Sequence, residues 1–194
     1  TLFQVITPMK SGILGVENIN KYLQNLFNSS REKSVKTRLY EYKLADKVIH
    51  IKNTNMKAQT MDMYKEGSDK FLEKRIFNGQ LGMIIKLNFE ESKAIILYPN
   101  DNIVVFYDFD ELESLISLAY CLTIHKTQGM EYETALIPMT FSHFIMHNTK
   151  LLYTAITRAK NMCYVVGEEE AFVTACKRIE TTKRETVIQD LLEE

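Results

Sequence analysis

The stretch that most constrains the fold runs from Leu118 to Glu131 and reads LAYCLTIHKTQGME. Its apolar first half predicts a strand over residues 118–125, and the pattern turns polar before the chain breaks at Gly129. In α/β proteins, ligands bind at the carboxyl ends of parallel strands, where the chain turns away from the sheet. We therefore expect this stretch to carry one strand of an α/β sheet and the edge of a binding site.

The segments around this stretch alternate as a parallel sheet requires. Apolar runs of strand length alternate with runs of helical periodicity after residue 118, and one strand and one helix precede them near the amino end. The expected strands cover residues 4–9, 118–125, 134–140 and 162–167, and the expected helices cover residues 16–27, 147–161 and 168–179. Because helices connect parallel strands, this order predicts a doubly wound α/β sheet.

The middle of the chain has a different pattern. Short β-rich runs separated by turn residues cover residues 47–53, 81–88, 93–99 and 102–109. Strands at such close spacing predict a small barrel or meander inserted into the α/β sheet. The polar segment 54–75 is expected to be a loop or a loosely packed helix. We predict a discontinuous α/β domain over residues 1–42 and 116–194, with an inserted β domain over residues 43–115.

Charge and cysteine content exclude several classes of protein. The formal net charge is −1, so any contact with nucleic acid must be local and not the effect of a global basic field. Three cysteines without metal-ligand spacing argue against a zinc site or a disulfide framework, and we expect a reduced, cytoplasmic protein with no metal site of its own. No apolar run is long enough to span a bilayer. Because the chain begins at Thr1 and enters a core strand directly, we expect a piece of a longer protein.

Polar residues at the end of the organising strand suit two ligands. Side chains alternate along a strand, so Thr123 and His125 are expected on one face, with the charge of Lys126 beside them. Hydroxyl, imidazole and ammonium donors suit a phosphate backbone, which offers acceptors and negative charge. Gly129 permits a sharp turn, and Glu131 can accept a hydrogen bond from a ribose hydroxyl. The alternative is that His125 is a core histidine and Glu131 a helix cap.

A second stretch, LLYTAITRAKNMCYVVG over Leu151–Gly167, is the expected partner of the first. Helical spacing buries its small and apolar residues and places Thr154 and Arg158 together on the opposite face. A guanidinium that reaches across an interface can stabilise charge developing on a γ-phosphate, as an arginine finger does. The alternative is an ordinary solvated arginine.

These residues resemble those of a known family. The sequences HKTQGMEY, LLYTAITRAK and VVG look like motifs V and VI of superfamily 1 helicases, in particular the RecD-like branch that includes the α chain of exodeoxyribonuclease V. The opening ITPMKSGILGVENINKYLQ resembles the motif IV region of that branch. The segments KLADKVIHIKN and RIFNGQLGMI resemble the start of its SH3-like insert. The likeness extends over nearly the whole chain.

The resemblance implies a fold and an activity. The fold would be the second RecA-like domain of a P-loop NTPase-type motor, a parallel sheet flanked by helices with an inserted SH3-like β-barrel. The whole protein would be an ATP-dependent DNA helicase that moves 5′→3′ on single-stranded DNA in recombination and repair. None of the seven glycines is followed by lysine, so no P-loop is present. ATP with Mg²⁺ would be bound mainly by an N-terminal RecA-like domain of the same protein, and this chain alone is expected not to hydrolyse ATP.

The resemblance also assigns roles to individual residues. It implies contact with single-stranded DNA for Thr123, His125 and Lys126, and for the turn that contains Asn78 and Gly79. The residues implied to contact the nucleotide are Gly129, Glu131, Thr157 and Arg158, with Arg158 as the arginine finger. Subunits of a nuclease complex are further partners that the resemblance admits.

Two other interpretations stay open at this point. A RecA-like module that binds nucleic acid without catalysis would share the fold, although motif-like residues over 123–131 and 154–158 count against it. A viral RNA helicase or the helicase part of a conjugative relaxase would share the motifs. A Walker A sequence upstream in the gene would exclude the first, and unwinding of tailed DNA and RNA duplexes would separate the others.

Overall fold

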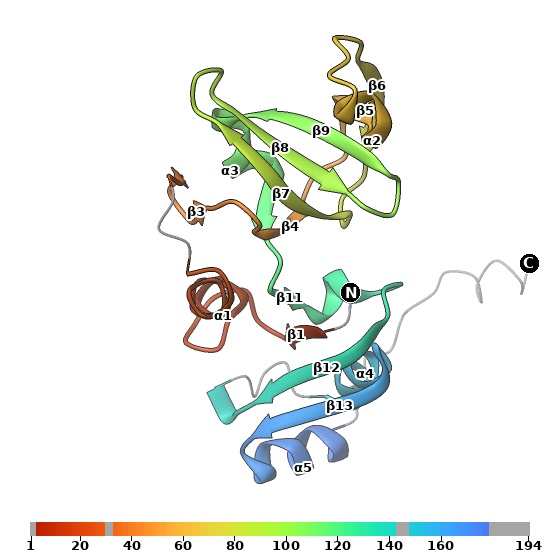
Figure 1. Cartoon of the computed structure of the whole chain (residues 1–194). Helices are drawn as coiled ribbons and strands as arrows, with labels where there is room; N and C mark the ends of the chain where they lie inside the picture. The colour runs from red at the N-terminus through yellow and green to blue at the C-terminus, as the bar shows by residue number, and fades with distance from the viewer. Residues whose placement is uncertain (1–2, 30–32, 143–147, 179–194) are drawn as a thin grey trace, which may run out of the picture.

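The computed structural model describes residues 3–29, 33–142 and 148–178. Two main sheets form the chain, one parallel and one antiparallel, and they lie one above the other in Figure 1. A short ribbon of β2 (Val35–Lys36) and β3 (Glu41–Tyr42) accompanies them. In the described part of the chain, no helix is long and apolar enough to cross a membrane.

The parallel sheet has four strands in the order β11-β1-β12-β13. Its strands are β1 (Phe3–Thr7), β11 (Cys121–Thr123), β12 (Tyr132–Met139) and β13 (Ala159–Gly167). The pairing of Val5 with Cys121 joins segments on either side of the insert. This pairing confirms the prediction that the parallel sheet starts before the insert and resumes after it.

Helices cover the two faces of this sheet. The helices are α1 (Val16–Phe27), α4 (Thr149–Ile156) and α5 (Glu169–Lys177). Val5 packs with α1 on one face, whereas its neighbour Ile6 packs with α4 and α5 on the other, because successive strand residues point in opposite directions.

The insert is an antiparallel sheet of seven strands in the order β10-β4-β7-β8-β9-β5-β6. Its strands are β4 (Lys47–His50), β5 (Thr54–Thr60), β6 (Leu72–Ile76), β7 (Leu81–Asn88), β8 (Lys93–Tyr98), β9 (Ile103–Asp108) and β10 (Ile116–Leu118). Three short helices complete it: α2 (Met61–Lys65), η1 (Phe109–Glu111) and α3 (Leu112–Leu115). The predicted β-rich insert is confirmed, whereas its description as an SH3-like barrel and its boundaries at 43 and 115 stay predictions.

A buried polar chain in the insert fixes the turn that faces the other sheet. Tyr98 and Tyr107 join their hydroxyl groups at 2.7 Å, and the Tyr107 hydroxyl lies 3.1 Å from His50 Nδ1. The carbonyl oxygen of His50 accepts a hydrogen bond of 2.8 Å from the amide of Gly79. The position of the turn between β6 and β7 is thereby tied to the core of the insert.

Two sequence predictions about elements were wrong. Segment 54–75 is not a loop or loose helix but the strands β5 and β6 joined through α2. The pattern hid β6 because it is an edge strand whose first four residues are exposed and mostly charged, so it lacks an apolar face. The helix expected over 147–161 ends at Ile156, because the chain turns and pairs with β12 from Ala159. Residues 147 and 179, the expected limits of two helices, lie outside the described residues.

The insert is joined to α1 by a fully buried carboxylate, Asp46. It accepts hydrogen bonds from Gln24 Nε2 at 2.5 Å, Asn28 Nδ2 at 2.7 Å and the Tyr120 hydroxyl at 2.9 Å. The backbone amide of Lys43 donates a fourth bond at 2.7 Å. Burial raises the pKa of Asp46, and these donors oppose that shift by favouring the carboxylate. This Asp46 junction fixes both chain crossings of the insert against the parallel sheet.

Candidate nucleotide and nucleic-acid site

A cleft of about 590 Å³ lies where the turn after β11 faces the insert. Its lining comes from three segments: Leu81, Pro99 and Asn100 of the insert; Gly129, Met130, Glu131 and Tyr132 of the turn; and Arg158 and Lys160 beside β13. The structure thus brings together Gly129, Glu131 and Arg158, which the sequence assigned to one ligand. The cleft also contains Asn100 and Lys160, which sequence reasoning did not single out.

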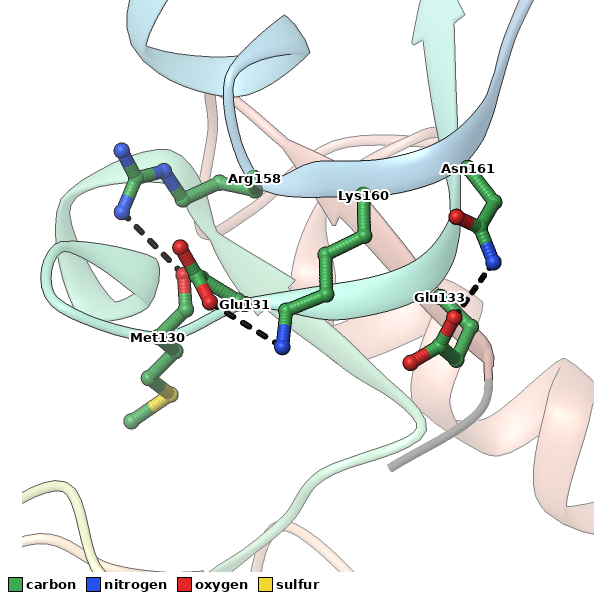
Figure 2. A network of polar contacts seen from close by, with 6 residues as sticks. All are labelled: Met130, Glu131, Glu133, Arg158, Lys160 and Asn161. Atoms are coloured by element: carbon green, nitrogen blue, oxygen red, sulfur yellow. Dashed lines mark hydrogen bonds and ion pairs between the residues drawn. The ribbon is translucent and has the colours of Figure 1, made fainter.

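Arg158 lies in the turn between α4 and β13, with its side chain half-buried. Its Nη1 donates to the carbonyl oxygen of Met130 at 3.1 Å, as Figure 2 shows. Its Nε donates to the Thr154 carbonyl at 3.1 Å, and its Nη2 donates to Thr157 Oγ1 at 3.2 Å. The guanidinium is therefore held at the edge of the cleft and is not freely solvated. Thr157 supports it directly.

The loop before β12 presents Gly129 and Glu131 to the cleft. Gly129 has φ of +79°, a conformation that residues with a Cβ rarely adopt, so the turn needs glycine here. The Glu131 carboxylate forms an ion pair of 3.1 Å with Lys160 Nζ, and both side chains are more than half exposed (Figure 2). Such an exposed pair is weak and leaves the carboxylate available to a ligand. Glu131 lies between η2 (Ile124–Thr127) and β12 and begins no helix, so the alternative of a helix cap is wrong.

The prediction that Thr123 and His125 share a strand face was wrong. Thr123 ends β11 and caps η2, because its Oγ1 accepts a bond of 3.4 Å from the amide of Lys126. His125 and Lys126 lie in η2, where side chains no longer alternate between two faces. Leu118, the expected start of this strand, belongs instead to β10 and pairs with Val48. His125 is exposed, so the alternative of a core histidine is also wrong.

A second cavity of about 240 Å³ contains Thr123 and Lys126 among its lining residues, together with Lys10. Partial burial lowers the pKa of Lys126, and the nearby charge of Lys10 lowers it further. Lys10 pairs only weakly with Glu17, at 3.8 Å. Sequence reasoning missed Lys10, although a lysine in the turn before α1 was the available signal. His125 is absent from this lining.

Asn78 and Gly79, for which contact with DNA was predicted, lie in the turn between β6 and β7, beside Met130 of the cleft. The amide of Asn78 donates to Asn53 Oδ1 at 2.8 Å, and Gly79 has φ of +100°. A Cβ placed on Gly79 would lie 3.7 Å from Met130 Cε. The turn thus packs against the loop that forms one wall of the cleft.

Within residues 3–29, 33–142 and 148–178, no three or more histidine, cysteine, aspartate or glutamate side chains are grouped as a metal site would require. The chemistry that the cleft offers is therefore that of its cations, its exposed carboxylate and its backbone carbonyl groups. Two cations and one carboxylate around an open cleft suit a phosphorylated ligand with hydroxyl groups.

Comparison with known proteins bears on this site. Residues 118–166 match the family described as UvrD-like helicase C-terminal domain. The chain is 35% identical over 175 residues to the ATP-dependent RecD2 DNA helicase of Deinococcus radiodurans, covering 90% of this chain and 21% of that protein. It is 22% identical over 170 residues to the RecBCD enzyme subunit RecD of Buchnera aphidicola subsp. Schizaphis graminum, covering 88% of this chain and 25% of the relative. The resemblance to RecD-type helicases of superfamily 1 is confirmed.

A solved structure extends the likeness to the fold. Pif1 helicase from Bacteroides, in complex with ADP-AlF3 and single-stranded DNA, superposes with a TM-score of 0.53 at 14% identity, covering 98% of this chain and 44% of that one. The parallel sheet of this chain therefore has the RecA-like fold that the sequence predicted. The chain spans a fifth to a quarter of the length of the two curated relatives.

Proposed function

We propose that this chain is the C-terminal part of an ATP-dependent DNA helicase that translocates 5′→3′ on single-stranded DNA and unwinds duplex. The observation that carries the proposal is the cleft in which Gly129, Glu131 and Arg158 converge beside the insert. It is supported by the relatives, one named as an ATP-dependent DNA helicase and one crystallised with ADP-AlF3 and single-stranded DNA.

In this proposal, the cleft is one wall of the ATP site. Arg158 and Lys160 supply positive charge, and Glu131 faces the ribose hydroxyls. The chain has no GxxxxGK[ST] sequence, so ATP with Mg²⁺ is bound mainly by an N-terminal RecA-like domain outside this chain. ATP, when bound there, supplies the free energy of hydrolysis that drives translocation.

Arg158 acts as the arginine finger across the cleft. Its guanidinium donates hydrogen bonds to uncharged oxygen atoms of Met130, Thr154 and Thr157. The charged oxygen atoms of a γ-phosphate in transfer are stronger hydrogen-bond acceptors than a carbonyl group. When the cleft closes, the guanidinium therefore moves to the γ-phosphate. Turnover then depends on closure between the two RecA-like domains.

Thr123, His125 and Lys126 bind the phosphates of single-stranded DNA, and the turn with Asn78 and Gly79 covers the DNA on the side of the insert. Hydroxyl, imidazole and ammonium groups contact phosphates without reading bases, so the grip is independent of sequence and weakens with salt. We extend the proposal to a cytoplasmic role in DNA recombination and repair, in which subunits of a nuclease complex are candidate partners. The main rival is a nucleic-acid-binding module without catalysis.

The experiment that tests the proposal is Arg158→Ala in the full-length protein. We expect ATP turnover to fall on the order of 10³-fold, because the transition-state charge loses its guanidinium, while binding of single-stranded DNA persists. Arg75→Ala is the matched control, because Arg75 is an exposed arginine on β6, over the ring of Phe77. Unchanged turnover in Arg158→Ala would overturn the finger. ATP hydrolysis by the purified 194-residue chain alone would overturn the proposal that this chain supplies only one wall of the ATP site.

A further inference from the structure

We propose that Met130 is a positioning residue that transmits the position of the insert to the Arg158 guanidinium. The proposal deepens the proposed function, because it makes the arginine finger responsive to whatever the insert contacts. Met130 suits this role because its side chain and its main chain face different partners.

The side chain of Met130 packs between the insert and the parallel sheet, whose core cluster around Tyr132 it also contacts. It packs against a cluster formed by Ile49 of β4 with Ala119 and Leu122, which Leu81 of β7 also joins. A Cβ on Gly79 would meet its terminal methyl at 3.7 Å. A shift of β4, β7 or the turn before β7 would therefore move the Met130 side chain.

Two further contacts hold Met130 at a defined position. The Tyr132 hydroxyl donates to its Sδ at 3.0 Å, and Tyr132 itself is buried. The Met130 amide donates to the Thr127 carbonyl at 3.0 Å, which ties it to the end of η2. The residue therefore also follows the helix that carries His125 and Lys126.

The main chain of Met130 faces Arg158. Its carbonyl oxygen accepts from Nη1 at 3.1 Å, while the Arg158 carbonyl accepts from the Tyr132 amide at 2.8 Å. Of the three hydrogen bonds described for the Arg158 side chain, the other two stay within its own turn, on Thr154 and Thr157. Because hydrogen bonds weaken steeply with misalignment, displacement of Met130 changes the hold on the guanidinium.

The simpler interpretation is that Met130 only fills space, as methionine often does in irregular cores. A space-filling residue would change stability without linking the insert to Arg158. The two interpretations differ in coupling, which a double-mutant cycle measures directly.

The first test uses the 194-residue chain and does not depend on catalysis. Gly79→Ala perturbs the insert turn, because φ of +100° strains alanine and its methyl group contacts Met130. We expect the Arg158 Nε–H resonance to shift in Gly79→Ala, and to shift much less when the same change is made in a Met130→Ala background. Equal shifts in both backgrounds would overturn the proposal, and so would the absence of any shift in Gly79→Ala.

The second test uses the full-length protein and measures how far single-stranded DNA stimulates ATP turnover. We expect Met130→Ala to lower the stimulation ratio about tenfold, a size typical of coupling between sites, and Met130→Leu to restore most of it. Met83→Ala is the matched control, because Met83 is an exposed methionine on β7. An unchanged ratio in Met130→Ala would overturn the proposal. Arg158→Ala could leave turnover intact while the Arg158 Nε–H shift in Gly79→Ala still depends on Met130. In that case the proposed function would fail, and the link from the insert through Met130 to Arg158 would stand.

Discussion

Two contacts between the sheets, the Asp46 junction and the cleft, differ in their chemistry. At the Asp46 junction, a fully buried carboxylate receives four hydrogen bonds from α1 and both chain crossings. At the cleft, the insert contacts the half-buried Met130 beside open space of about 590 Å³, and the exposed ion pair there lies wholly on the side of the parallel sheet. A buried, fully paired carboxylate resists displacement, whereas half-buried apolar contacts can slide. The junction is therefore suited to hold the insert, and the cleft is suited to respond to a ligand.

The largest effect is expected from breaking the junction with Asp46→Asn. Asparagine keeps the shape but turns one acceptor oxygen into a donor. The new donor then faces one of two donor pairs, either Gln24 with the Lys43 amide or Asn28 with Tyr120. We expect the free energy of unfolding to fall by about 3 kcal/mol, because buried donors lose their acceptor. Urea unfolding followed by circular dichroism measures the change.

The control for this variant is Asp101→Asn, because Asp101 is an exposed aspartate that accepts only an exposed bond from Gln80. Its unfolding free energy should change by less than about 0.5 kcal/mol. Equal effects of the two substitutions would show that the Asp46 junction is no stronger than a surface contact.

A smaller effect, dependent on pH, is expected from Lys47, which joins the insert to β1. Its Nζ donates to Gln4 Oε1 at 2.6 Å, and burial lowers its pKa from 10.5 to about 8. Above pH 8 the folded chain loses this proton while the unfolded chain keeps it, so the unfolded state binds more protons and stability rises with pH. The thiol of Cys121 and the hydroxyl of Tyr120 oppose this trend, because burial raises the pKa of each above its usual value. The unfolded chain therefore loses these protons first, near pH 9 for Cys121 and near pH 10 for Tyr120.

Thermal unfolding between pH 8 and about 9.5 measures this rise in stability. Lys47→Met should flatten the profile, because methionine fills similar space without a proton to lose. Lys21→Met on the exposed side of α1 is the matched control and should keep the slope. A slope that survives in Lys47→Met would assign the pH dependence to another group.

Much of the parallel sheet was predictable because its signals are local. Apolar runs of strand length marked β1 and β12, and helical periodicity marked α1 at its observed bounds. The edge strand β6 was not predictable, because most of its residues are exposed and α2 separates it in the sequence from its partner strand β5. The break between β10 and β11 was also hidden, because Leu118 and Cys121 are both apolar yet belong to different sheets.

The residues of the candidate site also fall into two groups, those that a local motif predicts and those that depend on tertiary packing. Gly129, Glu131 and Arg158 stand in two short motifs, and the structure brings those motifs to one cleft. Lys10, Asn100 and the role of Met130 depend on how distant segments pack, and no local pattern carries that information. The assignment of Arg158 to the γ-phosphate and of Thr123 to the strand stays a prediction.

A modest effect on the cleft side is expected from Gly129→Ala. No described atom lies within 4 Å of the Cβ that this change would add, so the cost comes from the positive φ alone. We expect a loss of about 1 kcal/mol in the free energy of unfolding. Denaturant unfolding tests this, with Gly67→Ala as the control, because Gly67 also has positive φ and open space. A much larger loss at Gly129 than at Gly67 would show that the cleft wall is as rigid as the junction.

The smallest effect is expected from removing the ion pair of the cleft with Lys160→Ala. Both Lys160 and Glu131 are more than half exposed, so solvent and salt screen their attraction. We expect the free energy of unfolding to change by less than about 0.5 kcal/mol, at low and at high salt alike. A loss comparable to that of Asp46→Asn would mean that the cleft is held by charge, and the contrast between a fixed junction and a responsive cleft would be lost. If stability is unchanged but nucleotide affinity of the full-length protein falls, Lys160 contributes to binding in the cleft and not to the stability of the wall that β12 and β13 form.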